Sequence, residues 1–192
     1  VHAIGEALTA LLMPAWLPGR YFGLKVVNVA PGNAALGLPG LFATYQLFDA
    51  ETGEPLALID GGEITARRTA AASALAASRL AREDARRQLI VGAGRVGGLL
   101  APAYRAVRSI DDVMVWSRDP QAALRLVIRL AAEGYPARVV TDLAKATPTA
   151  DIVSCATLSA EPLIQGEWLA PGSHLDLIGS FTPAMREADD AC

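Results

Sequence analysis

The sequence predicts an α/β protein, with a doubly wound parallel sheet in residues 86–192 and a separate α+β block in residues 1–85. From Gln88 onward, short apolar runs alternate with helical patterns, as they do in parallel sheets covered on both faces. One apolar run breaks into Gly92-x-Gly94-x-x-Gly97 just before a helical segment. In the first block, strand patterns follow one another directly, which indicates antiparallel pairing.

The first block contains three predicted strands and one long helix. The strands are expected over Tyr21–Val29, Phe42–Asp49 and Glu54–Ile59. The Glu51-Thr-Gly53 corner predicts a hairpin between the last two. A helix is expected over Gly62–Arg82, and because its charge-free middle is small on every side, we expect close packing all round. The linker between the blocks is placed near Glu83–Arg87.

The second block alternates five predicted strands with helices. The strands are expected over Leu89–Val91, Val113–Trp116, Ala137–Val140, Ile152–Cys155 and His174–Ile178. Helical segments are expected over Val96–Val107, Pro120–Glu133 and Leu143–Ala146. Asp119 is the expected cap of the second helix and Gly134 its end. A full sheet of this type has a sixth strand, so we expect the chain to be truncated.

Composition and charge exclude several classes of protein. The 192 residues carry a net charge of −3, which gives no reason to expect a nucleic-acid partner. No segment reaches the roughly 18 apolar residues of a membrane span, and the start lacks a signal-peptide pattern, so we expect no membrane and a cytosolic location. Two cysteines and two histidines argue against a disulfide framework, a metal site or a His-based hydroxy-acid dehydrogenase.

The glycine motif predicts a dinucleotide site of the Rossmann type. Gly92 allows a tight turn out of the strand, Gly94 removes a side chain that would block a pyrophosphate, and Gly97 lets the helix pack closely on the strand. Phosphates would then meet free N–H groups at the positive end of the helix. The ligand is expected to be a nicotinamide or flavin nucleotide.

The end of the second strand bears on the choice of nucleotide. An NAD-selective site usually has an acidic residue there, whereas this sequence has Ser117 followed by Arg118. Serine and arginine can hydrogen-bond and neutralise a 2′-phosphate, so NADP(H) is favoured over NAD(H). The alternative is that Arg118 is a solvated loop arginine. Asp119 could reach a ribose but is better explained as the helix cap.

Two cations in the first block are out of place for a purely structural role. Arg68 lies near the positive start of the predicted helix and shares a face with Ile64, Ala71 and Leu75. We expect that face to be buried, and an arginine held there calls for an anion. That anion could be a structural carboxylate or the carboxylate of a substrate. Lys25 interrupts an apolar strand; it could reach solvent at a sheet edge or line one anionic pocket with Arg68.

Several segments, in order, resemble the ornithine cyclodeaminase/mu-crystallin family. They are Lys25-Val-Val-Asn28, Gly37-Leu-Pro-Gly40, Thr65-Ala-Arg-Arg-Thr-Ala-Ala71, Gly92-Ala-Gly94, Val115-Trp-Ser-Arg118, Ala156-Thr157 with Pro162-Leu163, and Gly179-Ser through Arg186-Glu187. The resemblance implies a dimerising substrate domain (1–85), a nucleotide-binding domain (86–192) and a homodimer. Family members also extend beyond both ends of this sequence, so truncation at both ends is expected.

The resemblance also implies roles for individual residues. It implies that Lys25 is the substrate-side lysine and that Arg68 binds the substrate carboxylate, with Asn28 and Thr69 in the substrate pocket. It implies cofactor contacts at Gly92, Ala93, Gly94, Val96, Gly97, Ser117, Arg118 and Gly179, and a turn near the nicotinamide at Ala156 and Thr157.

Phe181 bears on which of the family's activities is expected. Ornithine cyclodeaminases carry an acid/base aspartate near this position, and a phenyl ring cannot carry a proton, although it can pack on a ring substrate. The form Gly179-x-Phe-x-Pro-x-Met-Arg-Glu187 resembles bacterial ketimine reductases. This resemblance implies NAD(P)H-dependent reduction of a cyclic imino acid, 1-pyrroline-2-carboxylate or 1-piperideine-2-carboxylate, to proline or pipecolate. The alternatives are an ornithine cyclodeaminase, another amino-acid dehydrogenase and a non-catalytic NADPH-dependent binding protein.

Overall fold

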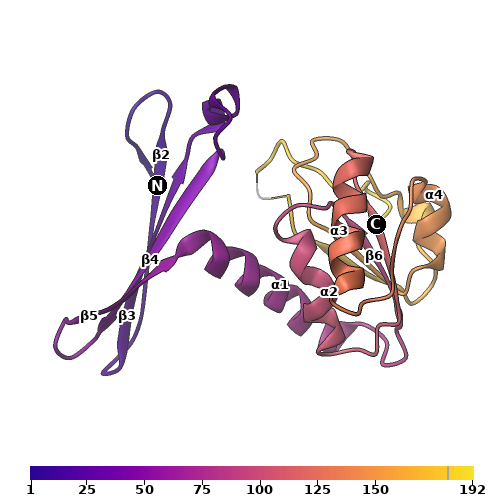
Figure 1. Cartoon of the computed structure of the whole chain (residues 1–192), viewed down its shortest axis with the longest axis horizontal. Coiled ribbons are helices and arrows are strands. Elements are labelled where there is room, and N and C mark those ends of the chain that lie inside the picture. The colour runs from indigo at the N-terminus through magenta and orange to yellow at the C-terminus, as the bar shows by residue number, and fades with distance from the viewer. Residues whose placement is uncertain (181) are drawn as a thin grey trace. The chain divides into compact units, whose positions relative to one another are not determined.

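The computed structural model describes residues 1–180 and 182–192. The chain divides into two compact units, Val1–Ala66 and Arg67–Cys192, and the division falls inside helix α1, Gly61–Leu80 (Figure 1). The boundary predicted near Glu83–Arg87 lies further along the chain than this division, because Ala70, Ala74 and Ala77 of α1 pack in the core of the second unit. The functional division into 1–85 and 86–192 stays a prediction.

The first unit is a five-stranded antiparallel sheet in the order β1-β2-β3-β4-β5. Its strands are β1 (His2–Ala3), β2 (Thr9–Leu17), β3 (Tyr21–Val29), β4 (Leu41–Asp49) and β5 (Pro55–Asp60), with a 3₁₀ segment, η1, at Pro31–Leu36. The three predicted strands and the hairpin between β4 and β5 are confirmed. Strand β2 is additional; it contains Pro14, which is tolerated because β1 pairs only with Thr9 and Ala10 and leaves the rest of β2 as a sheet edge.

The second unit is a five-stranded parallel sheet in the order β10-β9-β6-β7-β8. Its strands are β6 (Arg87–Val91), β7 (Asp112–Trp116), β8 (Ala137–Val139), β9 (Ile152–Cys155) and β10 (His174–Leu177). The helical segments are α2 (Gly97–Arg105), α3 (Pro120–Ala132), α4 (Leu143–Ala146), η2 (Thr147–Thr149) and η3 (Gly166–Trp168). Every predicted strand and helix of this block is therefore confirmed to within a few residues, and the doubly wound fold class with it.

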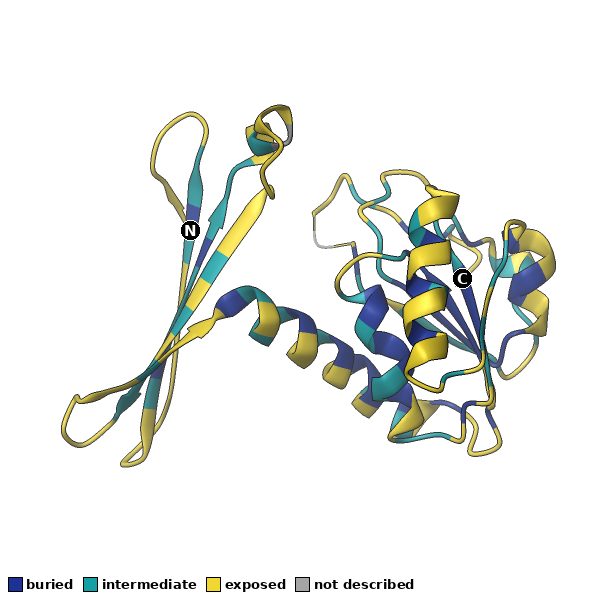
Figure 2. Ribbon diagram, viewed as in Figure 1, coloured by how far each residue is buried: buried dark blue, intermediate teal, exposed yellow. Residues whose placement is uncertain are grey.

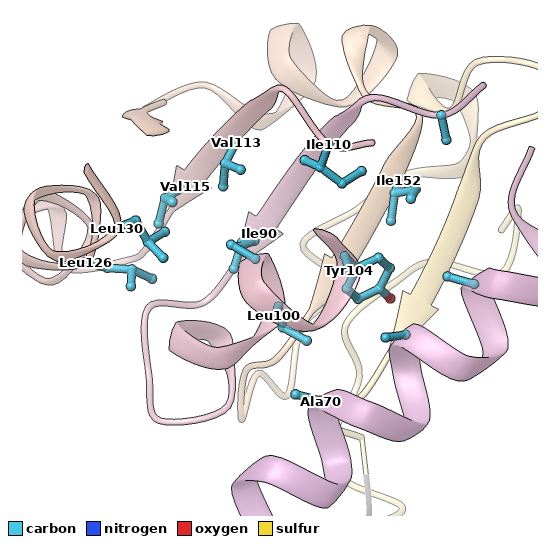
Figure 3. Packing of buried hydrophobic residues seen from close by; sticks show 14 of the residues in the cluster. Ala70, Ile90, Leu100, Tyr104, Ile110, Val113, Val115, Leu126, Leu130 and Ile152 are labelled. Atoms are coloured by element: carbon cyan, nitrogen blue, oxygen red, sulfur yellow. The ribbon is translucent and has the colours of Figure 1, made fainter. Parts of the chain in front are cut away.

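Both faces of the parallel sheet are buried, as the continuous apolar strands require. Ile90, Val113 and Ile152 face α1, α2 and α3, where they pack against Leu100 and Leu130 (Figure 3). On the other face, Leu89, Val91, Met114 and Val153 pack against α4 and Ile164. Figure 2 shows the middle of these strands buried while the outer side of α3 stays exposed. The alternation along each strand thus supplies two cores from one sheet.

Helix α1 packs by one face, which corrects the prediction of close packing all round. Ala70, Ala74, Ala77 and Ala81 recur every three or four residues and are buried in the core of the second unit. Leu75, on another side of the helix, is 63% exposed. The missing charge in this helix is therefore explained by small side chains that allow close approach on one side only.

The predicted helix boundaries in the second unit are confirmed by their capping contacts. Asp119 precedes α3, and its Oδ1 accepts a hydrogen bond from the Gln121 N–H at 2.9 Å. Gly134 follows α3 with φ +81°, the left-handed conformation that ends helices. Among the described residues, no helix has the length and apolar character needed to cross a membrane.

Candidate functional site

The glycine turn lies where the strand order of the parallel sheet reverses. Strand β6 pairs with β7 on one side and β9 on the other, so the loops that follow β6 and β9 flank the switch point. In open α/β sheets this crevice, outside the carboxyl ends of the strands, is where ligands bind. The sequence placed Gly92 and Gly94 here, directly after β6.

Each glycine of the turn has its own physical requirement. Gly92 has φ +111°, and a Cβ there would meet the Ala156 carbonyl oxygen at 2.5 Å. A Cβ at Gly97 would collide with the carbonyl oxygen of Gly92, so the start of α2 approaches the turn as closely as a glycine allows. At Gly94 a Cβ would have no neighbour within 4 Å. The turn therefore leaves open space at the one glycine whose expected purpose was ligand access.

The turn opens onto a pocket of about 290 Å³. Its lining residues are Gly92, Ala93, Gly94, Trp116, Ser117, Arg118, Asp119, Thr157, Leu158, Ser159 and Leu163. The pocket therefore joins the glycine turn, the end of β7 and the turn after β9, three segments that the sequence assigned to the cofactor. Ser117 is half-buried and Arg118 is exposed.

Asp119 is already engaged by its own helix. Besides capping α3, its Oδ2 accepts a hydrogen bond from Nη2 of Arg125 at 3.3 Å, and both side chains are exposed. A surface ion pair of this kind adds little stability. The interpretation of Asp119 as a helix cap is confirmed, and this leaves Ser117 and Arg118 as the polar groups available at the end of β7.

The turns after β9 and β10 meet beside the glycine turn. The Ala156 N–H donates to the Val91 carbonyl at 2.8 Å, which ties the turn after β9 to the end of β6. A Cβ at Gly179 would collide with the Thr157 carbonyl oxygen, so the turn after β10 is packed directly on the turn after β9. The predicted residues Gly92, Ala156, Thr157 and Gly179 therefore lie at one edge of the sheet.

Glu187 joins these two turns, and the sequence assigned no role to it. It is 1% exposed, and its carboxylate accepts hydrogen bonds from Thr157 and from the Gly179 N–H. Its partner Thr157 is 30 residues away, so no local periodicity could have revealed the contact. The only signal in the sequence was that Glu187 closed a family motif without an expected function.

Cys155 ends β9 close to this edge but takes no part in it. Burial raises the pKa of its thiol, and the charges of Glu187 and Asp176 raise it further. Because the thiolate is the reactive form, the side chain is an inert, small core residue, as predicted.

Lys25 and Asn28 lie in the first unit. Lys25 is half-buried on the central strand β3, not at a sheet edge, and its Nζ donates a hydrogen bond to Thr65 Oγ1 at 3.3 Å. A Cβ at Gly23 would collide with the Tyr45 hydroxyl, so that ring covers the same face two residues before Lys25. The lysine is therefore held by neighbouring side chains on a central strand, which excludes the alternative of a lysine at a sheet edge.

Arg68 and Thr69 belong to the second unit by the division of the chain. The prediction that Arg68 lies on a buried face is wrong: Arg68, Ala71 and Leu75 are all exposed, because the buried face of α1 is the alanine face that contains Ala70. Val96 and Ala93 are half-buried and pack against the core of the second unit. Phe181 lies outside the described residues.

The sheet order and the glycine turn define the second unit as a Rossmann-type dinucleotide-binding fold. Residues 7–192 match the ornithine cyclodeaminase/mu-crystallin family, and the chain belongs to this family. The resemblance found in the sequence is therefore confirmed.

Three similar proteins with known names can be compared with this chain. The Delta(1)-pyrroline-2-carboxylate reductase of Paracoccus denitrificans is 46% identical over 184 residues, which are 95% of this chain and 58% of that protein. An archaeal alanine dehydrogenase dimer with bound NAD is 34% identical with a TM-score of 0.88, covering 98% of this chain and 58% of that one. The Thermococcus litoralis Delta(1)-pyrroline-2-carboxylate reductase, solved with NADH and L-proline, is 31% identical with a TM-score of 0.82, covering 96% and 62%. The chain thus spans less than two thirds of these relatives.

Proposed function

We propose that the full-length protein containing this chain is an NAD(P)H-dependent reductase of a cyclic imino acid, producing proline or pipecolate. The observation that carries the proposal is the open crevice at Gly94, between the turns that follow β6, β7 and β9. The 46% identity to a named Delta(1)-pyrroline-2-carboxylate reductase supports the choice of substrate class.

The crevice fits a dinucleotide. The open side of Gly94 allows a pyrophosphate to approach the backbone at the start of α2, while the strained Gly92 turn and the tight Gly97 contact fix that backbone. A nicotinamide cofactor, when bound, supplies the hydride that a reductase needs. We assign Thr157, Ala156 and Gly179 to the nicotinamide end of the site, because they form the edge beside β9 and β10.

We assign substrate binding to two cationic side chains, Arg68 and Lys25. Arg68 is exposed and presents a guanidinium suited to bidentate binding of a carboxylate. The Lys25 ammonium is held in place by its hydrogen bond to Thr65. It would stabilise negative charge that develops on the substrate or would donate a proton to the imine nitrogen. Asn28 and Thr69 stay proposed substrate contacts; Asn28 lies three residues after Lys25 and therefore on the opposite face of β3. Phe181 cannot exchange a proton, which favours imine reduction over deamination at this position.

The decisive assay supplies the full-length protein with NADPH or NADH and 1-pyrroline-2-carboxylate. We expect loss of reduced-cofactor absorbance with formation of proline. Release of ammonia from ornithine without net use of cofactor would instead identify a cyclodeaminase. Cofactor binding without turnover of any imine, amino acid or keto acid would identify a binding protein. Either of these results overturns the proposal.

We propose NADP(H) as the preferred cofactor, on the strength of Ser117 and Arg118 in the pocket. Replacing Arg118 with glutamine should weaken NADPH binding by roughly 10- to 100-fold, the effect of a lost charged hydrogen bond, and leave NADH binding nearly unchanged. Arg138→Gln is the matched control, since Arg138 pairs with Asp112 at the start of β7, away from the pocket. Equal losses for NADPH and NADH would refute the preference.

We further propose a homodimer in the cytosol. The sheet of the first unit exposes large apolar side chains, among them Trp16, Phe42 and Leu58. The related archaeal structure is that of a dimer. Light scattering on the full-length protein should give twice the mass of one chain, and a monomer at micromolar concentration would exclude the assignment.

A further inference from the structure

The carboxylate of Glu187 is buried and fully engaged by hydrogen bonds from two loops. Oε1 accepts from the Thr157 N–H at 2.6 Å and from the Thr157 hydroxyl at 2.7 Å, and Oε2 accepts from the Gly179 N–H at 2.7 Å. Only 1% of Glu187 is exposed. Burying a carboxylate is costly, and short hydrogen bonds to the charged oxygens offset that cost only while their geometry holds.

The backbone of Glu187 is anchored as firmly as its side chain. Its carbonyl oxygen accepts hydrogen bonds from the N–H groups of Leu163 and Ile164 at 2.9 and 3.1 Å, and the neighbouring Ala188 forms a parallel bridge with Ile164. Ile164 is fully buried in the core beneath the sheet. The carboxylate is therefore fixed relative to the core and can set the position of the loops that it binds.

The two loops are packed in direct contact with each other. A Cβ at Gly179 would come within 2.7 Å of Glu187 Oε1 and would collide with the Thr157 carbonyl oxygen. Thr157 in turn lies against the glycine turn, since a Cβ at Gly92 would meet Thr157 Cγ2 at 3.0 Å. The three loops thus form one packed row along the carboxyl edge of β6, β9 and β10, with Glu187 as the tie between two of them.

The same hydrogen bonds orient the Thr157 hydroxyl. Its proton is donated to Glu187 and its oxygen accepts the Ser159 N–H at 3.3 Å, so one lone pair of the hydroxyl oxygen remains and it can act only as an acceptor. An acceptor at this place suits an amide N–H donor, such as the carboxamide of a nicotinamide. Removing the charge at residue 187 would release the hydroxyl to turn and to donate instead.

We propose that Glu187 is a positioning residue for hydride transfer: it holds the Thr157 and Gly179 turns in the arrangement that receives the nicotinamide end of the cofactor. The inference deepens the proposed function and rests on it for the assignment of that edge. Preorganised turns matter because small misplacements of reacting groups are costly in rate.

Asp151 provides a matched control at the opposite edge of the sheet. It is 9% exposed, and its Oδ2 accepts hydrogen bonds from the N–H groups of Arg86 and Arg87 at 3.0 and 2.9 Å, just before β6 and β9 begin. Like Glu187, it is a buried carboxylate that accepts hydrogen bonds from backbone N–H groups of a distant segment, and its Oδ1 also pairs with Nη2 of Arg82 at 2.7 Å. It differs in lying at the amino ends of the strands, away from the pocket.

The test compares Glu187→Gln with Asp151→Asn in the full-length protein by calorimetric binding. The ligands are NADPH and 2′-phospho-ADP-ribose, which lacks the nicotinamide. A glutamine side chain has one oxygen and one NH₂ group. In Glu187→Gln the donors of either Thr157 or Gly179 therefore face an amide nitrogen that cannot accept a hydrogen bond. We therefore expect NADPH affinity to fall by roughly tenfold, as for one lost charged hydrogen bond, with little change for the fragment. Asp151→Asn should change neither affinity, although both variants should unfold at lower temperature.

Activity gives a second readout. With 1-pyrroline-2-carboxylate, Glu187→Gln should lower kcat by up to about 100-fold, and the isotope effect with deuterated NADPH should rise as hydride transfer becomes limiting. Asp151→Asn should leave the isotope effect unchanged. If Glu187→Gln does not fold, Glu187→Asp, which keeps the charge at shorter reach, should show the same selective loss to a smaller degree.

The outcomes separate this inference from the proposed function. If the wild type reduces no cyclic imine, the proposed function fails, while the binding comparison still decides the role of Glu187. Equal losses of affinity for NADPH and the fragment, or the same losses in Asp151→Asn, overturn the inference and leave Glu187 a structural residue. Failure of the wild type to bind NADPH or NADH overturns both.

Discussion

Single alanine substitutions at Gly94 and Gly97 separate the effect of the glycine turn on ligand binding from its effect on folding. At Gly94 an added Cβ has no neighbour within 4 Å, and the backbone φ is not positive. The free energy of unfolding should therefore change by less than about 0.5 kcal/mol. The methyl group, however, stands where a pyrophosphate must approach the backbone, so NADPH affinity should fall by about tenfold or more.

At Gly97 two effects oppose each other. Alanine favours a helix over glycine by about 0.5–1 kcal/mol. The new Cβ would, however, lie closer than 3.0 Å to the Gly92 carbonyl oxygen, a separation that real Cβ atoms do not adopt. Overpacking of this kind costs about 1–3 kcal/mol, and a backbone oxygen in a strained turn cannot swing aside as a side chain would. We therefore expect net destabilisation of about 1–2 kcal/mol.

The assay is urea unfolding of both variants beside titration with NADPH. The expected pattern is a stable Gly94→Ala that binds poorly and a destabilised Gly97→Ala. Wild-type affinity in Gly94→Ala would show that no phosphate approaches this side of the turn. Wild-type stability in Gly97→Ala would show that α2 does not pack on the turn as described.

The other predictions concern stability. Burial acts to raise the pKa of Asp151, but the N–H groups of Arg86 and Arg87, together with the Arg87 guanidinium, outweigh it and hold the pKa below 3.8. The resulting stabilisation is present above pH 3.8 and is lost as pH falls through the folded-state pKa, so Asp151→Asn should flatten the acid limb of urea-unfolding curves. Burial and the charge of Arg108 hold the pKa of His174 below 6.5, against the opposing effect of the Asp176 charge. The free energy of unfolding should therefore decline as pH falls below 6.5, and His174→Gln should remove that decline in thermal melts. Leu100→Ala, at a fully buried position, should cost about 2–5 kcal/mol in chemical denaturation; a loss below 1 kcal/mol would contradict the packing around α2.

Local patterns accounted for most of the second unit. Apolar runs marked β6, β7 and β9, and Asp119 with Gly134 marked the two ends of α3, because capping and strand burial depend on neighbouring residues in the chain. Strand β2 was missed since Pro14 interrupts its pattern, and only its place at the sheet edge makes a proline acceptable.

Faces of helices were harder to predict than their positions. The sequence of α1 offers small residues on every side, so periodicity could not select Ala70 and Ala77 over Ala71 and Leu75 as the buried face. The core of the second unit makes that selection, and it turns Arg68 outward. Which face of a helix is buried depends on the surface that packs against the helix as much as on the helix sequence.

In the candidate site too, some features could be predicted from the local sequence and others depend on tertiary packing. The glycine turn could be read from the chain because its three glycines act within a few residues: one takes a positive φ, one leaves space and one allows helix packing. That these residues sit beside Thr157 and Gly179 follows from the strand order, and the role of Glu187 follows from hydrogen bonds spanning 30 residues. Conformational preferences and apolar periodicity act locally and are written in the chain, whereas the burial of a charge and the meeting of loops depend on long-range packing and exist only in the folded molecule.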